Sequence, residues 1–206
     1  MLGSTGMTIH ELLTKRFATK AFDSTKKVSS EDLTYILEAA RLSCSSANTQ
    51  PWKIIVVTNP ELRAKIREAG YGQPQITEAS HLLVVATMND PMVRVQQTVE
   101  IIAATSGQES ADKYKGMVTS LIPQAPEVAR AWLARQIYLA LQAMMLAGAE
   151  RGVDSCPMEG FSVEKVTELL GLTDCVATTM LPIGYAAQPG FPKTRVALKD
   201  MVEERA

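Results

Sequence analysis

The longest uninterrupted helical pattern in the sequence runs from Pro126 to Arg151 and is followed by Gly152. Proline fits the first turn of a helix and glycine commonly follows the last turn, so these residues mark the predicted ends. Between residues 131 and 149, apolar side chains occupy nearly every face of this helix. Such a helix must be covered on most sides. In a chain of 206 residues part of that cover is expected from a second subunit. The alternative is a central core helix of a monomer.

The composition is that of an ordinary globular domain. Hydrophobic residues make up 46% of the chain and charged residues 21%, both usual values for soluble proteins. The 21 Lys and Arg residues balance the 22 Asp and Glu residues, so nothing favours nucleic acid or an anionic membrane as a partner. The length fits one domain over residues 7–206. Residues 1–6 precede a second methionine and are set apart as an added leader, a disordered end or an alternative start.

Histidine and cysteine usage argues against two common kinds of active site. With only two histidines, His10 and His81, a histidine-rich metal site or a Ser-His-Asp hydrolase is hard to build, and we expect no metal. His81 stands just before an apolar run and is expected at a strand edge. The three cysteines form no C-x-x-C pair, which indicates reduced thiols. Because no signal pattern or membrane-length apolar run occurs, a cytoplasmic protein is expected.

Helical and strand patterns are interspersed but do not follow a regular βαβ order, which predicts an α+β fold. Thr8 and Glu11 form a capping box for a first helix, and Ser29 and Ser162 open others. Further helices are expected over 61–69, in the stretch 91–121 and over 126–151, and strands over 53–58, 82–88 and 175–186. In the last strand, Pro182 and Gly184 suggest an edge or a bend.

Four segments carry candidate chemistry, and two of them are cationic. Arg16 and Lys20 stand where the first helix ends, at a spacing that would place both on one helical face and let them meet an anion together. Lys193 and Arg195 lie in a polar tail, residues 188–206, that has no core of its own. Both pairs are also compatible with solvated surface charge.

The other two segments are loops suited to a planar, polar ligand. Residues 43–52 combine small hydroxyl residues with an Asn and a Gln directly before Trp52, which supplies short donors and acceptors and an aromatic surface. A polar loop with a buried Trp is the alternative. In residues 157–161, Gly160 lets backbone N–H groups approach a ligand without a side chain in the way.

Taken in order, these segments resemble the nitroreductase family, in the branch of oxygen-insensitive bacterial enzymes. The resemblance extends from about Ile9 to Arg195. It rests on the combination of an N-x-Q-P-W element with a P-x-E-G-F element, which here are Asn48, Gln50, Pro51 and Trp52, and Pro157, Glu159, Gly160 and Phe161. It implies a mostly antiparallel sheet flanked by helices, in a homodimer that exchanges its C-terminal tails. It also implies FMN as cofactor and NADH or NADPH as hydride donor.

The resemblance assigns roles to individual residues. Arg16 and Lys20 match the family's basic residues at the FMN phosphate and ring edge, and Lys193 and Arg195 match tail cations that close on the phosphate. Lys20 would stabilise the charge that hydride transfer leaves on the flavin. Glu159 and Gly160 match the segment facing flavin N5, so these two and Lys20 are the implied catalytic residues. The remaining implied cofactor contacts are Phe17, Ala18, Thr19, Ser45, Ser46, Asn48, Gln73, Gln75, Pro157 and Met158. Of these, Ser45, Ser46 and Asn48 would reach the cofactor across the dimer interface.

The sequence also departs from the family pattern. Ala18 replaces a frequent hydroxyl residue, Cys44 stands where many members have proline, and Gln75 takes the place of a lysine in some members. The implied reaction is a ping-pong transfer of hydride from NADH or NADPH through FMN to a small acceptor such as a nitroaromatic, a quinone or a flavin. Alternatives are a related enzyme for enone reduction or dehalogenation, and a flavin-binding dimer without significant turnover. The stretch 89–126, which matches nothing in the family, is expected to set the substrate range.

Overall fold

The centre of the molecule is a sheet whose neighbouring strands are all antiparallel. The computed structural model describes residues 7–205, so the expectation for residues 1–6 concerns positions outside the described part. The described strands are β1 (Trp52–Val57), β2 (His81–Met88), β3 (Asp154–Ser155) and β4 (Cys175–Gly184), in the order β1-β2-β4-β3. The pairing sets Trp52 opposite Thr87 and His81 opposite Ile183. The α+β prediction with an antiparallel sheet is confirmed.

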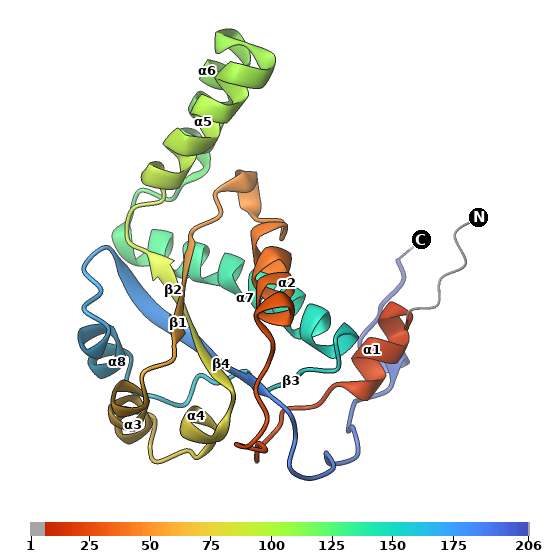
Figure 1. Cartoon of the computed structure of the whole chain (residues 1–206). Helices are drawn as coiled ribbons and strands as arrows, with labels where there is room; N and C mark the ends of the chain where they lie inside the picture. Colours follow the sequence, from red (N-terminus) through yellow and green to blue (C-terminus); the bar gives the residue numbers. More distant parts are fainter. Residues whose placement is uncertain (1–6, 206) are drawn as a thin grey trace.

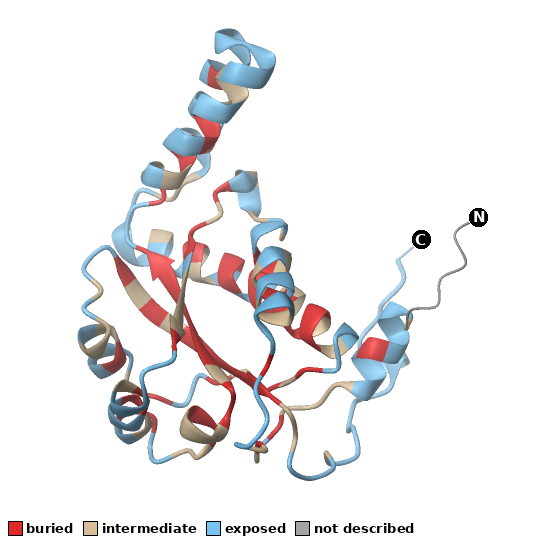
Figure 2. Cartoon of the chain, viewed as in Figure 1, coloured by how far each residue is buried: buried red, intermediate tan, exposed pale blue. Residues whose placement is uncertain are grey.

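Helices cover both faces of this sheet (Figure 1). On one face, α2 (Ser30–Arg41) and α7 (Pro126–Glu150) pack against Leu83, Val85 and Leu181. On the other, α3 (Pro60–Ala69), α4 (Gln75–Glu78) and α8 (Val163–Leu169) cover Leu82, Val84 and Met180. Residues that alternate along a strand point to opposite faces, so β2 has to be apolar at nearly every position. Figure 2 shows the resulting band of buried residues along the sheet and α7.

The long helix α7 is only partly covered within one chain. Leu133, Ile137 and Met144 are buried against the sheet. On the opposite side Tyr138 is 40% and Leu139 42% exposed. The single chain therefore leaves a helical face with apolar residues open, and the expectation that a second subunit supplies part of the cover stays a prediction.

The stretch expected to be helix-prone forms an arm that projects from the body (Figure 1). It consists of α5 (Met92–Ser106) and α6 (Gln108–Leu121), divided at Gly107, whose φ of 86° favours glycine. The two helices pack on each other around Val95, Val99 and Val118. The Tyr114 hydroxyl joins the arm to the body by donating to the Ala47 carbonyl at 3.1 Å.

The expectation of an edge or bend at Pro182 needs correction. Strand β4 pairs with β2 along most of its length, and Pro182 lies opposite Leu82 within that pairing. Its carbonyl accepts a hydrogen bond of 3.1 Å from the Cys156 N–H on the other side. In an extended strand the N–H and C=O of one residue point to the same side. The missing N–H of Pro182 therefore faces away from β2, so proline costs that pairing no hydrogen bond.

Helix α1 (Ile9–Lys15) begins with the predicted capping box, since Thr8 accepts from the Glu11 N–H and the Glu11 carboxylate accepts from the Thr8 N–H. Replacing Thr8 with Ala should lower the free energy of unfolding by about 1 kcal/mol, the usual cost of losing an N-cap side chain. Urea denaturation measures this change. Thr14→Ala, within the same helix, is the control and should change stability by less. Equal effects of the two substitutions would contradict the assigned cap.

Candidate functional site

Helix α1 ends at Lys15, and the residues that follow it are extended. Ala18 forms a parallel bridge with Ser155, and the Thr19 N–H donates to the Ser155 carbonyl at 3.1 Å. The prediction that Arg16 and Lys20 share a helical face is therefore wrong. Ala18 and Thr19 pair with Ser155 and do not form another turn of helix.

Arg16, Lys193 and Arg195 lie together as a cluster of positive charge, which we call the cationic cluster. The Lys193 ammonium donates to the Arg16 carbonyl at 2.6 Å. Burial, and next the charge of Arg195, lower the pKa of Arg16 from its usual value. Burial followed by the charges of Arg16 and Arg195 lowers the pKa of Lys193 in the same way. Like charges gathered in this way create a positive potential suited to an anion.

The tail is brought to this cluster by close packing at Gly190. A Cβ atom at this position would lie 2.4 Å from Cγ of Phe17, so only glycine lets the backbone pass over the aromatic ring. Just before it, the Ala187 N–H donates to the Ala21 carbonyl at 3.0 Å. Segments from opposite ends of the sequence therefore lie side by side, and the tail backbone packs on the Phe17 ring.

Unsatisfied polar atoms mark the same region. Among residues 7–205, the buried side-chain nitrogen and oxygen atoms without a hydrogen-bond partner are Arg16 Nε, Thr19 Oγ1 and Gln75 Oε1. Most buried polar atoms in proteins are paired, because an unpaired one costs about 1–3 kcal/mol. All three belong to residues that the sequence assigned to one ligand. Together they offer a donor, a hydroxyl and an acceptor.

Lys20 and Gln75 meet at a buried cysteine that the sequence analysis treated only as a reduced thiol. The Lys20 ammonium lies 3.6 Å from Sγ of Cys156. Burial raises the pKa of the Cys156 thiol, and Lys20, Gln75 and Arg16 partly offset this by favouring the thiolate. Its position beside the P-x-E-G-F element was the one available signal for it.

The P-x-E-G-F element is anchored by its backbone and presents Glu159 and Gly160 to solvent. Met158 exchanges backbone hydrogen bonds of 2.9 Å with Met180 in β4. The Gln73 side-chain amide donates to the Gly160 carbonyl at 2.7 Å, which joins two predicted segments. Pro157, the first residue of the element, is half-buried.

Tyr138 of α7 also holds this element, and the sequence analysis missed it. Its hydroxyl donates to the Glu159 carboxylate at 2.7 Å. Burial, with the Glu159 hydrogen bond and charge, raises the pKa of Tyr138 to about 12. The phenol therefore stays protonated and keeps donating to Glu159 across the neutral pH range.

Ser45, Ser46 and Asn48 lie elsewhere in the chain, beside the arm and α7. They belong to the loop containing the short helix η1 (Ser46–Asn48), and the Ser46 N–H donates to the Gln136 side chain at 2.8 Å. This loop is separate from the cationic cluster within one chain. Such a placement is compatible with a contribution to a site on a second subunit.

Backbone strain is concentrated in the candidate segments. In the described part of the chain, the non-glycine residues with positive φ are Ala47 (49°), Asn48 (53°), Gln50 (42°) and Tyr71 (56°). Three lie in the N-x-Q-P-W loop and the fourth stands two residues before Gln73. Side chains other than Gly, Asn and Asp rarely adopt this conformation, and it recurs where a backbone is shaped for a ligand.

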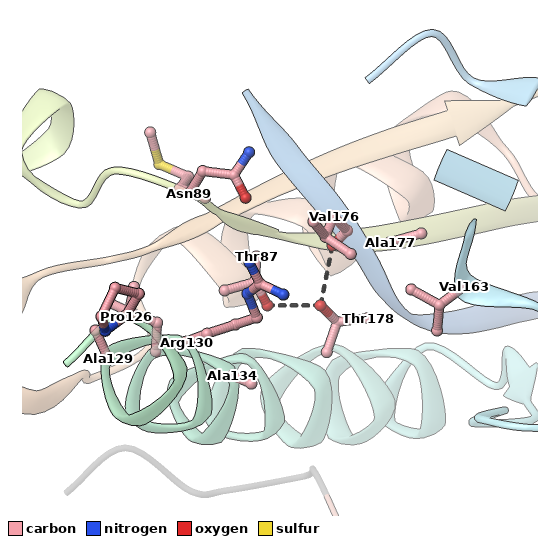
Figure 3. Close-up of a pocket in the computed structure, with 12 residues that line it drawn as sticks. Thr87, Asn89, Pro126, Ala129, Arg130, Ala134, Val163, Val176, Ala177 and Thr178 are labelled. Atoms are coloured by element: carbon pink, nitrogen blue, oxygen red, sulfur yellow. Dashed lines mark hydrogen bonds between the residues drawn. The ribbon is translucent and has the colours of Figure 1, made fainter. Parts of the chain in front are cut away.

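A separate pocket of about 500 Å³ opens between the start of α7, the end of β2 and the start of β4 (Figure 3). Asn89, Pro126 and Arg130 contribute to its wall. At its base the hydroxyls of Thr87 and Thr178 are hydrogen-bonded at 2.5 Å. It contains none of the predicted site residues. The candidate site is therefore assigned to the surface joining the cationic cluster, Thr19, Gln75 and the P-x-E-G-F element.

Residues 7–205 offer neither a metal-binding cluster nor a membrane-spanning helix. No three His, Cys, Asp or Glu side chains there come together as a metal-binding group. None of the described helices combines the length and the apolar character needed to cross a membrane.

Comparison with known proteins relates this chain to nitroreductases. A family model described as "Nitroreductase family" matches residues 13–185. A Bacillus subtilis protein named "Putative NAD(P)H nitroreductase YfkO" is 36% identical, with 91% of this chain and 93% of that protein covered.

Solved structures share the fold. An Exiguobacterium sibiricum structure, described as "a putative nitroreductase in complex with FMN", has a TM-score of 0.86 at 23% identity, covering 98% of this chain and 99% of that one. A gut-bacterial enone reductase has a TM-score of 0.85 at 22% identity, with both chains fully covered.

Proposed function

This chain belongs to the nitroreductase family, and we propose that it is an FMN-dependent oxidoreductase that takes hydride from NADH or NADPH. The single observation that carries the proposal is the set of unpartnered buried atoms on Arg16, Thr19 and Gln75 beside the cationic cluster. These residues can supply hydrogen bonds that a phosphate and a heteroaromatic ring edge require, and the protein itself leaves them unpaired.

The residues present fit FMN at both ends. Arg16, Lys193 and Arg195 would hold the terminal phosphate through charge-assisted hydrogen bonds. Phe17, Ala18 and Thr19 would line the cofactor. Gln75 and Gln73 would contact the polar edge of the ring. When bound, FMN supplies the ability to accept a hydride from a nicotinamide and pass reducing equivalents to a second substrate.

The protein's own part in this chemistry is orientation and charge. Lys20 is held beside Cys156, where its ammonium would oppose negative charge developing on the ring edge. Glu159 and Gly160 would be held at the ring by Tyr138 and Gln73. Their exposure leaves one side of the site open, so the nicotinamide and the acceptor can use the same place in turn. This is the basis for proposing a ping-pong reaction with nitroaromatic, quinone or flavin acceptors.

The active unit in this proposal is a homodimer in the cytoplasm. The open face of α7 and the exposed tail are surfaces that a second copy can cover. The same arrangement would carry Ser45, Ser46 and Asn48 to the partner's cofactor. The cysteines are all unpaired in the described chain, as in reducing compartments.

An enone-reducing enzyme is the second candidate. A structure with the same fold belongs to an enone reductase, and an open acceptor site admits either substrate class. Comparing turnover of a nitroaromatic, a quinone and an enone under one set of conditions separates them.

Chromatography of the cofactor released on denaturation tests the proposal. We expect FMN and not FAD, because the cationic cluster suits one terminal phosphate. Anaerobic NADH and NADPH should then bleach the flavin absorbance. Protein without flavin, which also fails to bind added FMN, would overturn the proposal. FMN without bleaching by either nicotinamide would leave a binding protein and contradict the enzyme.

Replacing Lys193 or Arg195 with Ala should weaken FMN binding by about 1–3 kcal/mol each, the range for a lost charge-assisted hydrogen bond. Fluorescence titration of the apoprotein measures the change. Lys199→Ala, farther along the tail, is the matched control and should bind FMN normally. Unchanged affinity in both test variants would mean that these cations are only solvated.

A further inference from the structure

A basic cavity lies outside the candidate site. It has a volume of about 430 Å³ and opens between the segment before α2, the end of β1, α3 and the start of β2. Its lining residues include none of those assigned to FMN and no Asp or Glu; they are Lys27, Val28, Thr58, Pro60, Arg63, Thr77, Ser80 and His81. Three basic side chains and three hydroxyls therefore surround it without an acidic partner among them.

Arg63 is the buried cation of this cavity, with a relative exposure of 6%. Its guanidinium donates to the carbonyls of Ile76 at 2.8 Å, Ala79 at 2.6 Å and Ser80 at 3.2 Å. These bonds position the group but use neutral acceptors, and a guanidinium has five N–H donors. Arg63 also forms none of the ion pairs found in residues 7–205. Buried charges in proteins are usually paired. The positive charge of Arg63 is therefore unusual, because it has no counterion among the described residues.

His81 and Lys27 extend the positive charge toward the opening. His81 Nδ1 lies 3.0 Å from the Ser80 hydroxyl, which in turn accepts from the Val28 N–H at 2.8 Å. Burial, followed by the charges of Arg63 and Lys27, lowers the pKa of His81. A bound anion would reverse the electrostatic part of that shift.

We propose that this cavity binds a small anion that carries a phosphate group. A tetrahedral oxyanion accepts several hydrogen bonds at once, which suits a fixed guanidinium flanked by an ammonium, an imidazole and hydroxyls. The volume exceeds what a phosphate alone fills, so the remainder can hold a small organic part. This site does not depend on the proposed FMN chemistry.

The two histidines allow a direct test by proton NMR of the imidazole resonances. Protein saturated with FMN is titrated with inorganic phosphate and, separately, with glycerol phosphate at constant ionic strength. We expect a saturable shift of the His81 signals and a rise in the pKa of His81. Added phosphate should not shift the signals of the exposed His10. Tighter binding of glycerol phosphate would assign an organic phosphate as ligand, and tighter binding of phosphate would assign the free ion.

Lys27→Gln tests the assignment without disturbing the core, because Lys27 is exposed. Its phosphate affinity should fall about fivefold, the effect of losing one exposed charge contact. Lys26→Gln is the matched control, since Lys26 pairs with Asp23 at 3.1 Å and does not line the cavity; its affinity should be unchanged. The proposal would be overturned if phosphate did not shift the His81 signals, or if Lys27→Gln and Lys26→Gln bound phosphate with equal affinity. If the protein bound no FMN, the His81 response would still report this cavity alone.

Discussion

Deleting the tail from Gln188 onward should give a protein that neither retains FMN nor dimerises. The deletion removes Lys193 and Arg195 from the cationic cluster, and it removes apolar residues of the tail that the single chain leaves exposed. Among them are Phe191 at 82%, Val196 at 66%, Leu198 at 75% and Met201 at 69%. Apolar side chains at this density in a segment without its own core are best explained by packing on another subunit. Light scattering measures the mass, and fluorescence titration measures FMN affinity.

A shorter deletion separates the two roles of the tail. Ending the chain at Arg195 keeps both tail cations and removes Val196, the short helix η2 (Leu198–Asp200) and Met201. This variant should dimerise more weakly at low protein concentration, and its melting temperature should rise more steeply with concentration. At concentrations that restore the dimer it should bind FMN. A folded monomer that binds FMN after the longer deletion would contradict both proposed roles.

Helix boundaries were predictable from the sequence because their signals are local. Thr8, Ser29 and Ser162 each cap the helix that follows them, and Pro126 stands in the first turn of α7. A capping side chain bonds to a backbone N–H two or three residues away. Such an interaction can be read without knowing the rest of the fold.

The extended form of residues 16–20 was not predictable in the same way. It depends on Ser155, which pairs with Ala18 and Thr19 from a distant part of the sequence. A helical continuation past Lys15 is equally compatible with the local residue types. The pairing decides between the two, because it satisfies backbone groups that a helix would satisfy internally.

The residues that hold the candidate site in place could not be predicted from the sequence, for a related reason. Tyr138 reaches Glu159 from α7, and Cys156 reaches Lys20 across the β3 end of the sheet. A tyrosine on an apolar helix carries no pattern that distinguishes it from a core residue. The one signal for Cys156 was its position beside the P-x-E-G-F element. The residues proposed to contact the ligand could be named from the sequence because their elements match a family, whereas residues that hold them in place depend on the packing of this chain.

Arg16 should be the most important single side chain for FMN binding. It is the one member of the cationic cluster that is half-buried, and its Nε is buried without a partner. Burial, and next the charge of Arg195, already disfavour its charged form, so a bound phosphate relieves more unfavourable energy here than at the exposed Lys193 or Arg195.

Arg16→Met should therefore weaken FMN binding by about 2–5 kcal/mol, the range for losing one partner of a buried charged contact, or about 30-fold or more in Kd. Riboflavin, which has the ring but no phosphate, isolates the cause. Its affinity should be nearly the same in the wild-type protein and in Arg16→Met, because Arg16 would act on the phosphate. Arg41→Met, at an exposed arginine paired with Glu38, controls for the loss of one positive charge and should bind FMN normally. If Arg16→Met weakened riboflavin and FMN equally, Arg16 would be supporting the fold of the site and the phosphate assignment would be wrong.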